Sequence, residues 1–302
     1  MIAIRFDRFG GPEVLRPVEL PAPRPQPGQT LITVEAAGVN FADTHQTDGS
    51  YLTADMLPHV PGSEVVGRTP DGRRVLARVS NGYAEQVLAA DSALVDIPED
   101  LPAAHALALL TQGLTAWHLL RTAARLVPGE RVVVHSAAGG VGSLAVQLAR
   151  RFGAARVLAQ ASTPDKRRLA LELGADGIAD YPLPEPADVV LDAVGGALFD
   201  QALDSLALSG RLVTYGNAAR TPFTPLDPAR LSRLNASVVG FWLRPTLKAP
   251  GAFAEPLREL LALTADGRLR PVTGPRYPLA QARRAHEDLL ARRTTGKVTL
   301  HP

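Results

Sequence analysis

Cysteine is absent from this chain of 302 residues. Its absence excludes disulfide bonds, thiol nucleophiles, iron–sulfur clusters and every zinc site that uses thiolate ligands. The seven histidines do not replace it, because they form neither an H-E-x-x-H motif nor an i, i+4 pair of ligands. We therefore predict that the chain has no metal site and that its histidines are scattered surface or core residues.

Long apolar runs and clusters of positive charge are absent as well. No segment approaches the roughly 18 consecutive apolar residues of a membrane span, and the N-terminal MIAIRFDRFG lacks the apolar run of a signal peptide. The formal net charge is +2, without a run of basic residues or an RNA-recognition motif. These observations favour a cytoplasmic protein that binds neither membranes nor nucleic acids.

The composition allows two globular domains, since 46% of the residues are hydrophobic and 21% are charged. The N-terminal third reads as short strands separated by turns, among them TLITVEAAGV and RRVLARVS. From Arg131 onward, apolar strands alternate with helices, as in RVVVHS followed by a helix from Val141. Such alternation predicts an α/β fold in which βαβ units build a doubly wound parallel sheet.

The segment HSAAGGVGSLAVQLAR, residues 135–150, joins an apolar strand to a helix through a glycine-rich turn. It matches the dinucleotide-binding pattern G-x-G-x-x-G at its second and third glycines, but Ala137 replaces the first. The helix that follows presents its positive end to a phosphate. A tight turn without a ligand is the alternative. The residues predicted to contact a nucleotide are Ala138, Gly139, Gly140, Val141 and Gly142.

The next strand ends at LAQAS, where an enzyme that prefers NAD offers Asp or Glu to the ribose hydroxyls. This chain has Ser162 there, followed by Thr163 and the cations Lys166, Arg167 and Arg168. We therefore predict that Ser162 and Lys166 bind the 2′-phosphate of NADPH. The alternative is that the cations form a solvated helix face.

Several separated segments resemble the medium-chain dehydrogenase/reductase superfamily, and specifically its zinc-free quinone oxidoreductase branch. They are AAGVNFADTHQTDGSY, PGSE, LTQGLTAWHLL, the A-A-G-G-V-G loop, VTYGN and the C-terminal YPLAQARRAHEDLLARRTTGKVTL. The resemblance covers nearly the whole chain. It implies a GroES-like, β-rich catalytic domain formed by residues 1–108 and 247–302, and a Rossmann NADP-binding domain formed by residues 109–246.

The resemblance also locates the positions at which zinc-dependent relatives hold their catalytic metal. At these positions the chain has Asn40, Ser63 and Thr111, none of which is the cysteine or histidine of those relatives. Alcohol oxidation by zinc acting as a Lewis acid is therefore disfavoured. The chemistry that fits is hydride transfer from NADPH to an acceptor that carries its own electron sink, such as a quinone or an α,β-unsaturated carbonyl.

Three side chains are predicted to serve the acceptor. Asn40 can donate an amide hydrogen bond to the acceptor oxygen or to the nicotinamide carboxamide. Tyr51 can donate a proton, because a phenol is neutral at pH 7; a packing role is its alternative. Phe241 is predicted to line the acceptor pocket, with a core position as its alternative.

Four further residues are predicted to contact the cofactor. The hydroxyl of Thr115 is expected near the nicotinamide, or else bonded back within its own helix. Tyr181 resembles the family tyrosine near the adenosine phosphate, and packing at a strand end is the alternative. Gly216 and Asn217 follow a strand at the carboxyl edge of the sheet, where such sheets bind ligands, or they simply form a turn.

The family that the chain resembles forms dimers through an edge strand, which corresponds to residues 238–243 here. A homodimer is therefore predicted. Within this strand, Phe241 and Leu243 are expected on one face and Trp242 on the other, because side chains alternate along a strand.

The residues leave three hypotheses open. The first is a zinc-independent NADPH:quinone oxidoreductase. The second is a reductase of enones, alkenals or enoyl thioesters that uses the same hydride step. The third is a non-catalytic NADPH-binding sensor or structural protein, since a fold does not fix a function. Steady oxidation of NADPH with a panel of quinones separates the third from the first two.

Overall fold

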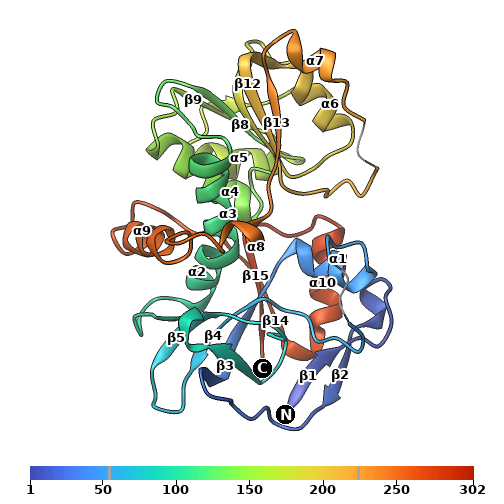
Figure 1. Ribbon diagram of the computed structural model, residues 1–302, viewed down its shortest axis with the longest axis vertical. Helices are drawn as coiled ribbons and strands as arrows, with labels where there is room; N and C mark the ends of the chain where they lie inside the picture. Colours follow the sequence, from blue (N-terminus) through green and yellow to red (C-terminus); the bar gives the residue numbers. More distant parts are fainter. Residues whose placement is uncertain (54–55, 223–224) are drawn as a thin grey trace. The chain divides into compact units, whose positions relative to one another are not determined.

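The computed structural model describes residues 1–53, 56–222 and 225–302, and it divides into two compact units (Figure 1). Unit 1 comprises Met1–Thr111 and Pro271–Pro302, and unit 2 comprises Gln112–Arg270. This division differs from the expected boundaries at residues 109–111, which belong to unit 1, and at residues 247–270, which belong to unit 2. The contacts that attach the latter segment include Trp117 Nε1, which donates to Glu259 at 2.8 Å, and His118 Nε2, which donates to the Ala252 carbonyl at 2.8 Å.

Unit 1 is built on a seven-stranded sheet in the order β14-β15-β3-β4-β5-β7, with β6 paired to β3. The last strand of the chain, β15, lies between β14 and β3, so the two ends of the sequence share one sheet. A separate hairpin pairs β1 with β2. The strands are β1 (Ile2–Arg5), β2 (Arg16–Glu19), β3 (Gln29–Val39), β4 (Glu64–Arg68), β5 (Arg74–Arg78), β6 (Gln86–Ala90), β7 (Leu94–Asp96), β14 (Thr273–Pro278) and β15 (Lys297–His301).

Three helices accompany this sheet: α1 (Phe41–Asp48), α2 (Ala103–Leu107) and α10 (Ala282–Leu290). Helix α1 begins directly after β3 because Asn40 and Asp43 form a capping box, which satisfies backbone N–H groups at the start of the helix. It ends at Gly49, whose φ of 79° is a left-handed conformation that glycine adopts without steric cost.

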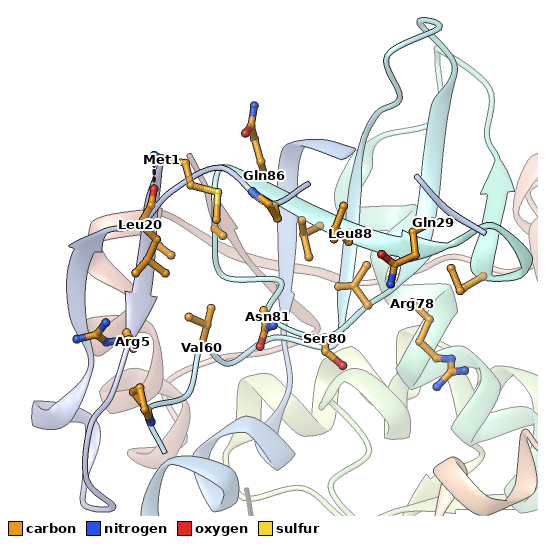
Figure 2. Close-up of a pocket in the computed structure, with 18 residues that line it drawn as sticks. Met1, Arg5, Leu20, Gln29, Val60, Arg78, Ser80, Asn81, Gln86 and Leu88 are labelled. Carbon is orange, nitrogen blue, oxygen red and sulfur yellow. Dashed lines mark hydrogen bonds between the residues drawn. The ribbon is translucent and has the colours of Figure 1, made fainter. Parts of the chain in front are cut away.

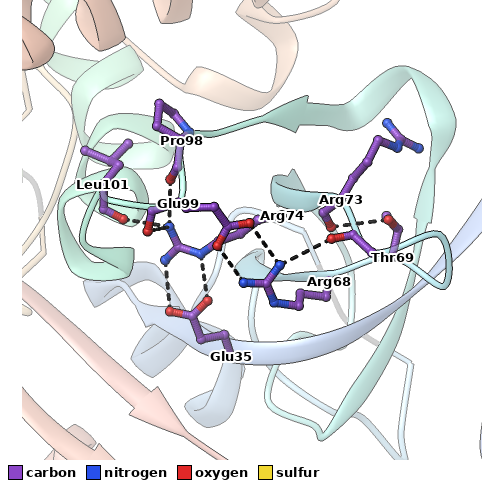
Figure 3. A network of polar contacts seen from close by, with 9 residues as sticks. Glu35, Arg68, Thr69, Arg73, Arg74, Pro98, Glu99 and Leu101 are labelled. Carbon is purple, nitrogen blue, oxygen red and sulfur yellow. Dashed lines mark hydrogen bonds and ion pairs between the residues drawn. The ribbon is translucent and has the colours of Figure 1, made fainter.

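The segment that leads into α2 is held by Arg74, whose side chain is nearly buried (Figure 3). The Arg74 guanidinium donates to the carbonyls of Pro98 at 2.9 Å, Glu99 at 3.2 Å and Leu101 at 2.8 Å, and pairs with both carboxylate oxygens of Glu35. One side chain thus donates hydrogen bonds to three backbone carbonyls of a segment that lies outside the strands. The segment before α2 is therefore anchored to β5 and β3.

Unit 2 is built on a six-stranded parallel sheet in the order β10-β9-β8-β11-β12-β13. This is the doubly wound order of a dinucleotide-binding fold. Successive strands are added toward one edge of the sheet up to β10 and toward the other edge from β11 onward, so the order switches between β8 and β11. The strands are β8 (Arg131–Val134), β9 (Arg156–Ala159), β10 (Gly177–Ile178), β11 (Ala187–Asp192), β12 (Leu206–Thr214) and β13 (Ser237–Gly240). The predicted α/β class with a parallel Rossmann sheet is confirmed.

The helices of unit 2 precede, connect or follow these strands. They are α3 (Leu114–His118), α4 (Gly140–Arg151), α5 (Pro164–Glu172), α6 (Ala197–Asp204), α7 (Pro228–Ser232), α8 (Leu243–Thr246) and α9 (Ala254–Ala265), and two π-helical segments, η3 (Ala108–Gly113) and η4 (Leu119–Ala123), flank α3. Helix α4 packs on its sheet through buried residues such as Leu144, Val146 and Leu148. In the described part of the chain, no helix has the length and apolar character needed to traverse a lipid bilayer.

The last strand of this sheet is shorter than expected. Strand β13 ends at Gly240, opposite Thr214, the last residue of its only strand neighbour β12. The Phe241 N–H still donates to the Thr214 carbonyl at 2.9 Å, but the strand pairing ends there and Trp242 is the N-cap residue of helix α8. The expectation that Phe241 and Leu243 share one strand face is therefore wrong.

Candidate functional site

Four polar residues of unit 1 meet where three strands of its sheet begin or end. Asn40 follows β3, Glu64 begins β4 and Lys297 begins β15. The register pairs Val298 with Val39 and Val65 with Ala37, so the sheet itself brings these positions together. We call Asn40, Glu64, Thr111 and Lys297 the Glu64 cluster.

The carboxylate of Glu64 is the centre of this cluster. Its Oε1 accepts from Lys297 Nζ and, at 2.9 Å, from Asn40 Nδ2. Its Oε2 accepts from the Thr111 N–H at 2.9 Å and from the Thr111 hydroxyl at 2.5 Å. Glu64 and Lys297 are both fully buried. Removing an ion pair from water costs free energy, which is offset only if the geometry is good and further hydrogen bonds are made. The four donors to the Glu64 carboxylate meet this requirement.

The ion pair fixes the orientation of the Asn40 amide. Lys297 Nζ can only donate, and it lies 2.9 Å from Asn40 Oδ1, whereas the Glu64 carboxylate can only accept and faces Nδ2. Turning the amide over would place its NH2 against the ammonium and its oxygen against the carboxylate. Asn40 is therefore held in one sense, at the end of β3 and 5% exposed.

A second buried group lies one turn into α1. Asp43 Oδ2 accepts from the Asn40 N–H at 2.9 Å and from the Tyr83 hydroxyl at 2.7 Å, and the same hydroxyl lies 3.2 Å from His286 Nε2. Burial raises the pKa of Asp43 from 3.8 to about 6, although both hydrogen bonds oppose the shift. Burial also lowers the pKa of His286 to about 4 and raises that of Tyr83 well above 10.

Tyr51 lies beyond the C-terminal end of α1. Its N–H donates to the His45 carbonyl at 3.1 Å, and the residue is partly exposed. Tyr51 is therefore beside the His45 turn of the helix, while Asn40 is at the start of the same helix. Both predicted acceptor residues of unit 1 flank α1, and Phe241 belongs to unit 2, where its N–H donates to the Thr214 carbonyl at 2.9 Å.

A hollow of about 680 Å³ is found elsewhere on unit 1 (Figure 2). It lies among the β1–β2 hairpin, the segment that follows β5 and strand β6. Leu20, Val60 and Leu88 line it together with Arg5 and Arg78. Neither Asn40 nor Tyr51 is among its lining residues, so this hollow is separate from the predicted acceptor site.

In unit 2, the glycine-rich turn follows β8 and leads into α4, with Gly139 as the N-cap. A Cβ on Gly142 would lie 2.2 Å from the Ser136 carbonyl oxygen, so the helix can approach the strand only if this residue is glycine. Ala137 is fully buried and donates its N–H to the Gln160 carbonyl at 3.0 Å. The first position of the pattern thus accommodates a methyl group, and the third does not.

The carboxyl edge of the same sheet contains polar atoms that lack partners within the described part of the chain. Tyr215 OH and Asn217 Oδ1 are buried without a hydrogen bond, while Asn217 Nδ2 donates to the Thr221 carbonyl at 2.8 Å. A Cβ on Gly216 would lie 2.8 Å from the Ala193 carbonyl oxygen. Buried polar atoms cost free energy unless a partner satisfies them. Their place beside the glycine turn therefore fits a bound dinucleotide.

The predicted phosphate residues follow β9. Ser162 is exposed, and Thr163 caps α5 by accepting from the Lys166 N–H at 3.3 Å. Arg167 pairs with Asp180 at 2.8 Å and Arg168 with Asp165 at 2.9 Å. Acidic neighbours therefore engage Arg167 and Arg168.

Tyr181 begins a chain of hydrogen bonds that the sequence did not suggest. Its hydroxyl lies 2.7 Å from His135 Nε2, and His135 Nδ1 lies 2.9 Å from Asp192 Oδ1. His135 and Asp192 are fully buried, and Asp192 also accepts from the N–H groups of Val194 and Gly195. Thr115, also predicted near the cofactor, is buried in α3.

Sequence reasoning missed Glu64, Lys297, His135 and Asp192 as site residues. Glu64 and Lys297 each directly precede apolar residues of a strand, and a charge next to such residues is a signal of a buried partner. His135 and Asp192 each end an apolar parallel strand at the edge where ligands bind. The sequence therefore contained a signal at each of these four positions, but it did not indicate which residue pairs with which.

Comparison with known proteins is consistent with both units. Residues 26–99 match the family model described as alcohol dehydrogenase GroES-like domain, and residues 173–300 match the model described as zinc-binding dehydrogenase. The chain is 34% identical to a quinone oxidoreductase of Pseudomonas aeruginosa, over 99% of both chains. 

Two solved structures are also similar over 100% of both chains. The quinone oxidoreductase of Thermus thermophilus, solved with and without NADPH, has 43% identity and a TM-score of 0.89. A mycobacterial protein in complex with NADPH has 36% identity and a TM-score of 0.93.

Proposed function

Because this chain belongs to the quinone oxidoreductase branch of the medium-chain dehydrogenase/reductase superfamily, we propose that it is an NADPH-dependent quinone oxidoreductase. The observation that carries the proposal is the full-length similarity to such enzymes, together with the glycine turn and unpartnered polar atoms at the carboxyl edge of β8 to β12. When bound, NADPH supplies the hydride for the reaction.

We propose that unit 2 holds the cofactor through residues along one sheet edge. Residues Ala138 to Gly142, at the start of α4, would lie against the pyrophosphate, because a helix N-terminus attracts anions. Asn217 and Tyr215 provide hydrogen-bonding groups from the end of β12. Ser162, Lys166 and Tyr181 lie toward the adenosine end of such a site, and Thr115 and Gly216 complete the set of predicted contacts.

For unit 1 we propose that the acceptor is reduced without zinc. Two of the three positions that hold the metal in zinc-dependent relatives, Asn40 and Thr111, are bonded to Glu64 instead. The fixed Asn40 amide is then the group that orients an oxygen of the acceptor or of the nicotinamide carboxamide. Tyr51 is proposed as a proton donor to that acceptor, and Phe241 as a wall of its pocket.

A panel of acceptors tests this function. Purified protein should oxidise NADPH steadily with simple quinones, and slowly or not at all with alkenals and enoyl thioesters. Preference for an enone would replace the quinone assignment, and the absence of turnover with every acceptor, despite NADPH binding, would favour a non-catalytic role. In a Tyr51→Phe variant, loss of activity confined to enones would identify the phenol as their proton donor, since a quinol can take protons from water.

A homodimer through β13 is the second part of the proposal. Strand β13 is at the edge of the six-stranded sheet, and an unpaired edge strand presents a row of N–H and C=O groups for pairing with another strand. A cytoplasmic location is likewise proposed, which fractionation of expressing cells tests.

A further inference from the structure

The hollow of unit 1 is preformed, because backbone hydrogen bonds tie two of its walls together (Figure 2). The Ile4 N–H donates to the Tyr83 carbonyl at 2.8 Å, and the Glu85 N–H donates to the Ile2 carbonyl at 3.0 Å. Strand β1 of the hairpin is thereby fixed to the segment that leads into β6. At about 680 Å³, the hollow falls within the range of about 300–1,000 Å³ that small-molecule sites occupy.

The walls of the hollow are mostly aliphatic. Leu20, Val60, Val79 and Leu88 line it, and each is only partly buried, so apolar surface is left for a ligand to cover. No Phe, Tyr or Trp is among the described residues that line the hollow, so it offers no aromatic ring on which a flat ligand stacks. These walls therefore suit an alkyl chain better than an aromatic ring.

Positive charge lies at two sides of the hollow. Figure 2 shows Arg5 and Arg78 well apart, with Val60 and Leu88 between them. Arg5 Nε lies 2.8 Å from Asp7 Oδ1, so a carboxylate already offsets its charge. The Arg78 guanidinium, at the exposed end of β5, has neither a hydrogen bond nor an ion pair within the described part of the chain. No Asp or Glu is among the described lining residues, so the charge of Arg78 is left for a ligand to neutralise.

Two neutral hydrogen-bonding side chains follow Arg78 along the chain. Ser80 and Asn81 also line the hollow, and among the residues that the structure describes their side chains have no hydrogen-bond partner. A guanidinium presents parallel N–H groups that match both oxygens of a carboxylate, and a hydroxyl and an amide can each donate one hydrogen bond more. This side of the hollow therefore suits a carboxylate.

We propose that the hollow binds an aliphatic carboxylate, with its carboxylate at Arg78 and its alkyl chain along Leu88 and Val60 toward the β1–β2 hairpin. Burial of the alkyl chain supplies affinity, and Arg78 selects an anion over a neutral or cationic ligand. None of the residues proposed to bind NADPH or the acceptor lines the hollow. The site is therefore additional to that of the proposed reaction, and its occupation does not require turnover.

Calorimetric titration with decanoate tests the proposal, with decanol, decylammonium and acetate as comparison ligands. Decanoate should bind at least about tenfold more tightly than decanol, since a hydrogen bond to a charged partner is stronger than one to a neutral partner. Decylammonium should bind more weakly than decanol, and acetate, which lacks the alkyl chain, should not bind. The absence of decanoate binding, or equal affinities for decanoate and decanol, would overturn the proposal.

The variant Arg78→Glu reverses the charge at an exposed side chain that makes no bond in the fold. It should lose affinity for decanoate and bind decylammonium instead, while its melting temperature stays that of the wild type. Arg8→Glu is the matched control, because Arg8 is another exposed arginine of unit 1 that does not line the hollow. It should leave the decanoate affinity unchanged. Decanoate affinity that survives Arg78→Glu, or displacement of decanoate by NADPH or by a simple quinone, would contradict a site in this hollow.

Discussion

At the scale of single residues, the Glu64 cluster joins stability to activity. Lys297→Met leaves the Glu64 carboxylate buried without its cation, and removing one partner of a buried pair costs about 3–5 kcal/mol. It also removes the donor that fixes the Asn40 amide. We expect kcat to fall about tenfold or more, since small losses of positioning are costly, while the Kd for NADPH stays unchanged.

Arg74→Met is the matched control for this variant, measured at a temperature where both proteins are folded. Arg74 is buried and also forms an ion pair in unit 1, with the exposed carboxylate of Glu35, in the network of Figure 3 and outside the Glu64 cluster. The Arg74→Met substitution should lower the free energy of unfolding and leave kcat unchanged. An unchanged kcat in folded Lys297→Met would show that the cluster does not position Asn40.

Asp43 predicts a dependence of stability on pH. Its pKa is 3.8 when unfolded and about 6 when folded, because burial disfavours the charged form. An acid with a raised pKa binds its proton more tightly in the folded state, so its contribution is greatest below pH 3.8 and is lost as the pH rises through about 6. At about 1.4 kcal/mol per pKa unit, the loss is about 3 kcal/mol.

Asp43→Asn removes this titration while keeping an oxygen that can accept from Tyr83. Denaturant unfolding at a series of pH values measures the pH-dependent stability that Asp43 contributes. The free energy of unfolding of the variant minus that of the wild type should rise by about 2.4 kcal/mol between pH 4 and pH 7. A difference that is flat with pH would mean that Asp43 is not buried as the structure has it.

Individual residues were partly predictable from the sequence. The steric demand at Gly142 follows from the pattern of the loop, and the structure places a carbonyl where its side chain would be. The partnership of Glu64 and Lys297 does not follow, because 233 positions separate them and only the order β15-β3-β4 makes them neighbours. For the same reason Asn40 was predicted as a donor, without the ion pair that determines its orientation.

At the scale of elements, β13 gives a test of the proposed dimer. The Phe241 N–H points toward β12, so by alternation the Val239 N–H points the same way and the Val238 N–H points outward. Proline lacks this N–H and is tolerated only on an outward-facing edge. Val238→Pro should therefore abolish dimerisation and leave the monomer folded.

Light scattering measures the outcome, with Val239→Pro as the control. That substitution removes a hydrogen bond to β12 and should lower the melting temperature as well. A wild-type protein that is monomeric at micromolar concentration, or a Val238→Pro variant that remains dimeric, would contradict pairing through this edge.

The sequence predicted elements better where the pattern was long. Residues 131–159 were assigned correctly as strand, glycine turn, helix and strand, because apolar periodicity and turn chemistry agree there. Residues 241–243 were assigned wrongly, because their apolar character suits a strand but β12 ends at Thr214 and offers no partner. The length of an edge strand depends on where its neighbouring strand ends, and the sequence of the edge strand itself does not show this.

At the scale of the whole molecule, the two units can be followed separately. Both tryptophans of the chain, Trp117 and Trp242, belong to unit 2, so their fluorescence reports the unfolding of that unit alone. NADPH at a hundredfold excess over its Kd should stabilise the folded form by about 2.7 kcal/mol. We expect the fluorescence transition to move to higher temperature with NADPH.

Circular dichroism, which reports both units, should then show a component that does not move. An excess of a quinone without NADPH is the control and should leave the fluorescence transition where it is. Coincident shifts in both probes would show that the units unfold as one.

The position of β15 also determines when unit 1 can form. This strand is the last of the chain, yet it lies inside the sheet of unit 1 and supplies the buried Lys297. During synthesis, all of unit 2 is translated before β15, whereas the sheet of Met1–Thr111 is completed only with residues 271–302. Residues 1–111 are thus translated before unit 2 yet complete their sheet after it, and an open sheet edge in this interval favours aggregation.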